Sequence, residues 1–297
     1  MLLNAAAIRL ATTGFKAKMS AAEAKVTPLY GPFCELVTSS GYAETYLQPA
    51  GIGQLREWTG ERQIGNIKVF SQTLTNRDWE KTVGIPRNAF LDDQLGMFSG
   101  RFVEMAVMAK LHPDKLFGEL LVDGFTAEAW DGVSYFSDNH PLADGNVQSN
   151  LVSGALSAST FRAAVTKLRQ MKSWENEPMD VFALGGQTTL VVGPALEDTA
   201  RGILLAEYGA SGASNTDHAR AELKVFSRIT GNQWFVGMSD SPLRPFVFQE
   251  RQKPELIVKA NADDDNVFHN KQVLFGVDGR WEMGYAFYHF MVGSTGA

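Results

Sequence analysis

The sequence has a single cysteine and no long apolar run. With Cys34 alone among 297 residues, no disulfide can form within the chain, and a reducing compartment is the simplest origin. No stretch approaches the roughly 18 apolar residues that a membrane span needs, and the short apolar N-terminus lacks the cleavage pattern of a signal peptide. The sequence therefore predicts a soluble protein without a membrane partner.

The sequence also has no excess of basic over acidic residues. The net charge is -6 and the pI is near 5.5, whereas surfaces that neutralise nucleic-acid phosphates are usually strongly basic. Apolar residues make up 44% of the chain and aromatic residues 11%, which is enough for a well-packed core. The composition is that of a globular protein of one large domain or two.

Catalytic and metal-binding motifs are scarce as well. Asp138 and His140 could form a hydrolytic site with Cys34 as the nucleophile, but no motif surrounds Cys34 and the pair lacks a third spaced ligand. The acidic run Asp263 to Asp265 lacks the spacing of a calcium loop. Glycines 185, 186 and 193 match neither a dinucleotide nor a P-loop fingerprint. We expect no catalytic residue, no metal and no cofactor, with the Cys34 and His140 hydrolase kept as an alternative.

One segment of the chain is typical of an extended strand pair, or ribbon, in which neither face is apolar enough to pack against a core. In LREWTGERQIGNIKVFSQTLTNRDWEKTVGIPR, residues 55–87, alternation from Ile67 puts apolar and polar side chains on both faces. Turn-forming residues 75–78 predict a hairpin whose second strand resumes at Trp79. An isolated hairpin is marginal in water, so Trp58, Phe70 and Trp79 are expected to contact another surface, of this chain or of another copy.

The remaining pattern predicts an α+β fold. One-face apolar spacing indicates a long helix through Phe102 and Leu121, kinked or restarted at Pro113, and a second helix from about 159 to 172. Pro194 opens a third helix after a buried strand at 188–192. Short strands are expected at 223–229, 233–238, 244–249, 255–259, 272–277 and 285–292.

Several long blocks resemble, in order, the major head subunit of Mu-like tailed phages. The blocks are the ribbon itself, LDDQLGMF, HPDKLFGELLVDGF, WDGVSYFSDNHPL, RPFVFQERQKPELIV, DDDNVF and LFGVDGR, which cover roughly residues 50–142 and 234–293. The resemblance implies a Hong Kong 97-type (HK97-like) capsid fold and a major capsid protein that encloses double-stranded DNA in an icosahedral shell. A nanocompartment shell protein of the encapsulin type is the alternative within the same fold.

The resemblance also implies an organisation into parts. These are an N-terminal arm at 1–50, an extended loop at 51–87, a peripheral domain with a spine helix at 88–157, an axial domain at 158–239, and a return to the peripheral domain at 240–297. The spine helix would run from about Leu91 to Val122, and the loop 209–219 would lie near the axial tip.

In this fold the extended loop lies across a neighbouring subunit, which would explain a ribbon with no core face of its own. The implied partners are other copies in hexamers and pentamers, a separate scaffold protein and maturation protease, a portal, and decoration proteins. Some members of the wider fold carry a Lys to Asn cross-link between subunits, and Lys68 and Lys81 lie on the ribbon, but non-covalent contact is expected here. The candidate contact residues are Arg56, Glu57, Trp58, Lys68, Phe70, Arg77, Trp79 and Lys81.

Overall fold

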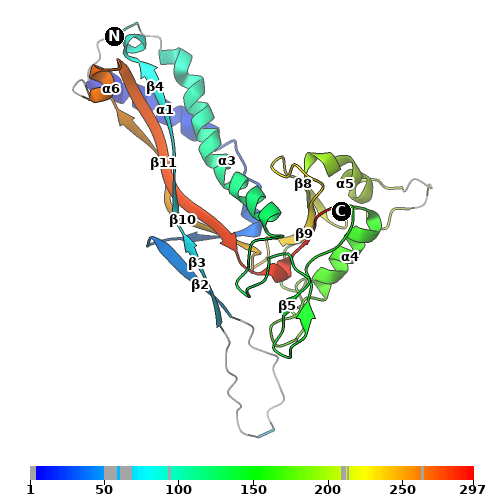
Figure 1. The fold of residues 1–297 in the computed structure, drawn as a ribbon. Helices are drawn as coiled ribbons and strands as arrows, with labels where there is room; N and C mark the ends of the chain where they lie inside the picture. The colour runs from blue at the N-terminus through cyan, green and yellow to red at the C-terminus, as the bar shows by residue number, and fades with distance from the viewer. Residues whose placement is uncertain are drawn as a thin grey trace.

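The chain is described by a computed structural model that covers residues 5–49, 59–60, 69–92, 95–208, 212, 214–261 and 264–297. Two four-stranded sheets organise it, one long and one short, with a two-stranded arm projecting from their meeting point (Figure 1). The mixture of helices and strands is the expected α+β composition. Among the described residues, no helix is long and apolar enough to cross a bilayer.

The long sheet has the strand order β1-β10-β11-β4. β10 and β11 are antiparallel strands of 14 residues each, and β4 continues the antiparallel pattern on β11, while β1 pairs with β10 in parallel. Pro254 falls where β10 has passed the end of β1, at an edge without a partner strand in the described chain, as expected because proline cannot donate a ladder hydrogen bond. The strands are β1 (Cys34–Thr38), β4 (Arg77–Pro86), β10 (Phe246–Lys259) and β11 (Gln272–Tyr285).

Two long helices, α1 (Ala5–Glu23) and α3 (Ser99–Asp123), cover one face of this sheet. Phe15 of α1 stacks on Phe102 of α3 with ring centroids 3.7 Å apart, and both rings meet Phe275 of β11 edge-on. Residues at 3–4 spacing along α3 are buried, which is why the stripe read from the sequence forms a helix. Pro113 lies inside α3, so the helix is not restarted there.

The predicted start of this helix at Leu91 is too early. A separate short helix, α2 (Arg87–Leu91), ends there, and the 3-10 turn η2 (Leu95–Phe98) precedes α3. At the other end Tyr285 donates its hydroxyl to the Leu120 carbonyl at 3.0 Å, which ties the last turns of α3 to β11.

The short sheet has the order β12-β9-β7-β8, with two helices on one of its faces. α4 packs on β12 and β9, and α5 packs on β7 and β8, so the helices lie over opposite edges of the sheet. Ser157 and Thr160 form a reciprocal capping box at the start of α4. The elements are β7 (Gln187–Val192), β8 (Glu222–Val225), β9 (Trp234–Ser239), β12 (Met291–Ser294), α4 (Ala158–Arg169) and α5 (Glu197–Leu204), which follows the 3-10 turn η3 (Pro194–Leu196).

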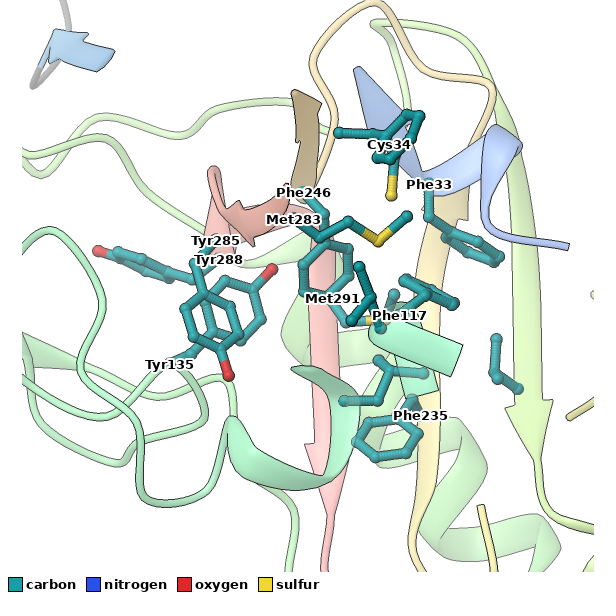
Figure 2. Close-up of a cluster of buried hydrophobic side chains, with 14 of the residues drawn as sticks. Phe33, Cys34, Phe117, Tyr135, Phe235, Phe246, Met283, Tyr285, Tyr288 and Met291 are labelled. Carbon is teal, nitrogen blue, oxygen red and sulfur yellow. The ribbon is translucent and has the colours of Figure 1, made fainter. Parts of the chain in front are cut away.

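An aromatic core joins the two sheets (Figure 2). Phe117 of α3 contacts Phe33, Phe226 and Phe246 with ring centroids 5.2 to 5.5 Å apart. Phe235 of β9 faces this core, while its neighbours in the strand face the helices of the short sheet. Side chains from both sheets and from α3 therefore form one continuous interior.

The predicted hairpin between residues 67 and 85 is wrong. β3 (Val69–Thr75) pairs with β2 (Ala43–Pro49), and β4 pairs with β11. The supposed turn is a break at Asn76, where the chain passes from the arm into the long sheet. We call β2 and β3 together the arm.

Short helices, turns and strands form the connections between the main elements. The 3-10 turn η1 (Gly31–Phe33) leads into β1, and the loops that follow α3 contain the short hairpin of β5 (His140–Pro141) and β6 (Val147–Gln148). A short helix, α6 (Asp265–Phe268), connects β10 to β11, and the 3-10 turn η4 (Tyr288–Phe290) connects β11 to β12. The expected return of the last strands to one domain is thus corrected: β10 and β11 join the long sheet, and β12 joins the short one.

Candidate functional site

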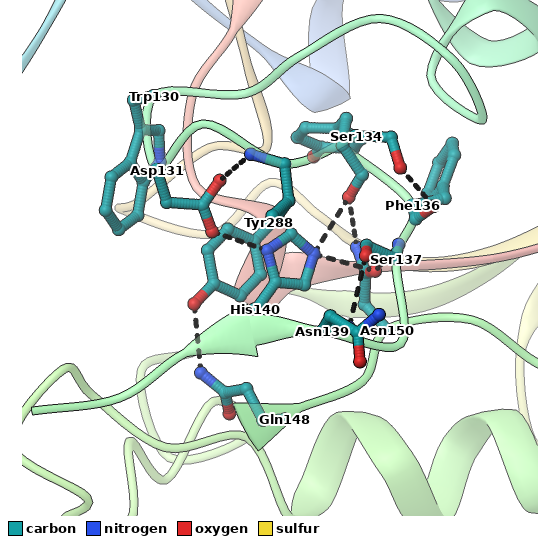
Figure 3. A network of polar contacts seen from close by, with 12 residues as sticks. Trp130, Asp131, Ser134, Phe136, Ser137, Asn139, His140, Gln148, Asn150 and Tyr288 are labelled. Carbon is teal, nitrogen blue, oxygen red and sulfur yellow. Dashed lines mark hydrogen bonds and ion pairs between the residues drawn. The ribbon is translucent and has the colours of Figure 1, made fainter. Parts of the chain in front are cut away.

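The residues of the hypothetical hydrolase do not form a catalytic site. Cys34 is buried in the core, and burial raises the pKa of its thiol well above the ordinary value, so the reactive thiolate is disfavoured. His140 Nδ1 bonds to Asp131 Oδ2 at 2.6 Å, and its Nε2 lies 3.1 Å from Asn150 Oδ1 (Figure 3). Neither ring nitrogen bonds Cys34, and Asp138 instead accepts a hydrogen bond from Ser149 at 2.6 Å.

This polar cluster has a structural role. The side chains of His140 and Asp131 are 0% and 1% exposed, and the His140 ring stacks on Tyr288 at 3.6 Å between centroids. Asn150 donates to the carbonyls of Tyr135 and Met291 and accepts the backbone N–H of Ser137. The cluster fixes the loops after α3 against the turn that leads into β12. Loss of one member would leave buried polar atoms of the others without a hydrogen-bond partner, which is costly.

The described carboxylates of the acidic run serve the turn around α6. Asp264 accepts the backbone N–H of Asn261 at 2.8 Å, and Asp265 opens α6, while Asp263 lies outside the described residues. Nowhere in the described part of the chain do three His, Cys, Asp or Glu side chains gather as metal ligands.

The most unusual local structure is the junction at the base of the arm. Gln249 of β10 is fully buried; its Oε1 accepts the hydroxyl of Tyr46 and its Nε2 donates to Asn76 Oδ1, both at 2.8 Å. Asn76 in turn donates to Ser39 Oγ at 2.8 Å. The amide of Gln249 therefore ties the long sheet to both strands of the arm.

The turn that leads into the arm is fixed by one carboxylate. Glu44 Oε1 accepts the backbone N–H groups of Ser40 and Gly41 at 2.7 and 3.0 Å, and the hydroxyl of Ser39 at 2.9 Å. These hydrogen bonds, led by that of Ser40, lower the pKa of the Glu44 carboxyl. The direction in which the arm leaves the body is thus set by specific polar contacts at its base.

Of the predicted contact residues, the described aromatic ones pack within their own chain. Phe70 lies 4.6 Å from Trp130 and 5.1 Å from Trp174 between ring centroids. Trp79 lies 4.3 Å from the His112 ring and donates its indole N–H to the Trp281 carbonyl. Both side chains are half-buried, and each packs its strand, β3 or β4, against the aromatic core.

Of the charged contact candidates that the structure describes, Arg77 is paired within its own chain and Lys81 is exposed. Arg77 forms an ion pair with the nearly buried Glu282, next to it in the long sheet, and lies over the Trp79 ring. Lys81 is exposed on β4. Arg56, Glu57, Trp58 and Lys68 lie outside the described residues. Exposed apolar side chains that periodicity did not single out, Tyr42 and Leu47 at the arm, are further contact candidates.

The long sheet with its two covering helices, the short sheet and the projecting arm define the fold of the phage capsid proteins of the Hong Kong 97 type. The procapsid protein of bacteriophage JBD30 has this fold, with a TM-score of 0.63 at 22% identity over 98% of this chain and 76% of that one. A family model described as Mu-like prophage major head subunit gpT matches residues 8–158, 151–229 and 226–297.

The chain therefore belongs to the Mu-like prophage major head subunit gpT family. It is 27% identical to the major capsid protein of Escherichia phage Mu, over all of this chain and 76% of that protein. It is 22% identical to the Mu-like prophage FluMu major head subunit of Haemophilus influenzae, over 93% of this chain and 68% of that one.

Family membership confirms several expectations. The chain is a major capsid protein, a structural component of the virion, and neither an enzyme nor an encapsulin-type shell protein. The HK97-like fold implied by the resemblance is also confirmed.

Proposed function

We propose that the chain builds the icosahedral head of a Mu-like tailed phage from hexamers and pentamers that enclose double-stranded DNA. The net charge of -6 suits a wall that surrounds DNA without binding it by sequence. A portal closes one vertex, and a scaffold protein and a maturation protease act during assembly. Decoration proteins are a further partner class; the capsid of bacteriophage JBD30 is decorated with minor capsid protein trimers.

The observation that carries this proposal is the arm. Among the described residues its two strands pair only with each other, although a two-stranded ribbon is marginal in water without further packing. Leu47 is 66% exposed on it, and Tyr42, at its base, is 70% exposed. A surface on a neighbouring copy would bury these side chains and complete the arm.

The organisation into parts follows from this role. Residues 1–50 are the N-terminal arm, of which α1 packs on the long sheet and β1 belongs to it, and 51–87 are the extended loop, of which β4 belongs to the long sheet. Residues 88–157 with most of 240–297 form a peripheral domain, and 158–239 form the axial domain. Contacts through Arg56, Glu57, Trp58, Lys68 and Lys81 are non-covalent. Because Phe70, Arg77 and Trp79 hold their own chain together, they act on the contact by positioning the arm.

A deletion tests the role of the arm. Removal of residues 67–82 is unsuitable, because Arg77 to Thr82 pair with β11 and the deletion would destroy part of the long sheet. The register between β2 and β3 allows a better deletion. Gln48 pairs with Phe70, so an Asn-Gly turn in place of residues 49–69 closes a tight hairpin. This variant keeps Tyr46 and Phe70, which fasten the arm to the body.

We expect the shortened variant to fold with the thermal stability of the unassembled wild-type subunit but to form no shells. Electron microscopy and sedimentation of both proteins, alone and with their neighbouring phage genes, make the comparison. A substitution of Leu47 by Ala in the full-length arm is the matched control and should weaken assembly without abolishing it. Normal shells from the shortened variant would refute the proposed role of the extended loop, which this variant loses between Gln48 and Phe70.

A further inference from the structure

A broad open concavity of about 710 Å³ lies beyond the C-terminal end of α4. The β5-β6 hairpin and residues 170–178 form its other walls. Three basic side chains line it, and among the described residues that line it none is acidic, although the chain as a whole carries a net charge of -6. The basic residues are Lys167, Arg169 and Lys172.

The three cations are held by neutral partners. Lys167 donates to Ser149 Oγ and Lys172 donates to Asn176 Oδ1, each at 2.7 Å. Arg169 lies over the Phe182 ring with its Cζ atom 4.2 Å from the centroid. Two carboxylates accept hydrogen bonds from these neutral partners, Asp138 from Ser149 and Asp144 from Asn176. The positive groups are thus presented to the concavity without a direct ion pair.

The helix end accounts for only part of this arrangement. Lys167 and Arg169 lie in the last turn of α4, where basic residues favourably oppose the negative end of the helix dipole. That effect does not explain Lys172, which lies beyond the helix, or a concave wall rich in amides. A negatively charged partner explains all three.

The same domain carries an acidic surface at its opposite end. α5 lies over the β8 edge of the short sheet and α4 over the β12 edge, and Figure 1 shows α5 and β5 at opposite ends of this part of the molecule. Glu197 is paired with Arg201, but Asp198 and Glu207 are exposed with no ion pair in the described chain. Two exposed apolar side chains, Leu205 and Tyr208, accompany them.

We propose that the basic concavity of one copy receives the acidic α5 side of a second copy, in a head-to-tail contact that repeats around a ring. Two different surfaces at opposite ends of one domain give a heterologous interface, which closes into a ring when the rotation between copies allows. Complementary charge accelerates the encounter and fixes its register, while Leu205 and Tyr208 supply apolar contact area. The inference rests on the proposed function, since it names the contact that would hold a capsomer together.

A charge exchange tests this pairing. One variant carries Arg169→Glu and Lys172→Glu, a second carries Asp198→Lys and Glu207→Lys, and a third combines all four. We expect each double variant to assemble at least ~10-fold more slowly than wild type at low salt, and the combined variant to recover. A variant with Arg169→Lys and Lys172→Arg keeps the charge and serves as the matched control. Light scattering follows assembly, and electron microscopy identifies the product.

The outcomes separate the inference from the function on which it rests. If wild type forms shells and both double variants do so at the same rate, the charge pairing is refuted and the proposed function stands. If wild type forms no oligomer under any condition, both are refuted. A concavity that serves DNA instead would show normal assembly of the first variant together with lost, salt-sensitive binding of double-stranded DNA, and that result would also overturn the pairing. Should a reversed variant fail to melt cooperatively, the Arg169→Gln and Lys172→Gln pair replaces it.

Discussion

His289 should make the stability of the unassembled subunit depend on pH. Its ring is buried beside Tyr288, 3.9 Å away between centroids, and neither ring nitrogen has a hydrogen bond of good geometry. Burial lowers the pKa of His289 to about 3, with a smaller contribution in the same direction from His140, while the Lys172 backbone acts the other way. The folded protein therefore holds this histidine neutral.

The sign and size of the effect follow from proton linkage. An unfolded histidine has a pKa of about 6.5, so between pH 6.5 and pH 3 the unfolded chain binds more protons at this residue than the folded chain. The free energy of unfolding is unaffected above this window and falls as the pH drops through it. At pH 4.5, two units below the unfolded value, the loss is about 3 kcal/mol.

Two measurements check this prediction. In an NMR titration of the imidazole Cε1–H signals, the His289 signal, assigned by its absence from a His289→Phe variant, should not shift between pH 8 and pH 4.5. The same variant keeps a ring for the Tyr288 stack and removes the titrating group. Its denaturation midpoints should imply a loss of stability between pH 7.5 and 4.5 that is about 3 kcal/mol smaller than in wild type. A His289 signal that titrates near pH 6.5 would refute the reasoning.

Two further predictions concern the arm junction and the core. Gln249→Ala should cost about 3 kcal/mol in unfolding free energy, because it leaves the buried Asn76 amide oxygen unsatisfied, whereas Tyr46→Phe should cost about 1 kcal/mol; equal costs in denaturant titrations would contradict this difference. Cys34 should not react with a thiol reagent until the subunit unfolds, because its thiol is buried; rapid reaction of the native subunit would count against the described core.

Periodicity predicted the helices well because each presents an apolar stripe to a sheet. α4 begins and ends within three residues of the helix predicted at 159–172, and α5 begins three residues after the predicted start at Pro194. Phe161, Ala200 and Leu204 form part of the buried stripes of these helices. The buried strand at 188–192 is β7, extended by one residue. An apolar stripe shows which face of a helix is buried even where the partner strand is distant in the sequence, as β12 is for α4, so the pattern within the segment is enough to predict the helix.

Strand pairing was predicted less well, for a physical reason. The alternation at 69–75 is real, with Phe70, Gln72 and Leu74 on the more buried face and Ser71 and Thr73 exposed. Alternation gives the faces of a strand but not its partner, and the partner of β3 lies before it in the sequence. Turn-forming residues at 75–78 were therefore read as a hairpin, when Asn76 is in fact a buried member of the junction.

The candidate site was the least accessible to sequence reasoning. Gln249 and Asn76 are polar residues in apolar surroundings, and nothing in their spacing marks them as partners 173 residues apart. The same is true of the basic concavity, whose walls come from three separate segments between residues 142 and 178. Such sites are created by the fold, so a pattern within one segment does not predict them.

The distribution of exposed apolar residues bears on how a shell can close. These residues lie on separate elements of the fold, for example Leu47 on the arm, Met108 on α3 and Tyr208 after α5. Single side chains of this kind give weak contacts, and linking many weak contacts raises the overall affinity steeply because each later contact is intramolecular. Weak individual contacts also allow a wrongly placed copy to leave before the ring closes. Loss of one contact surface should therefore impair assembly while leaving the subunit folded: the shortened variant should form no shells, and each charge-reversed variant should form them at least ~10-fold more slowly.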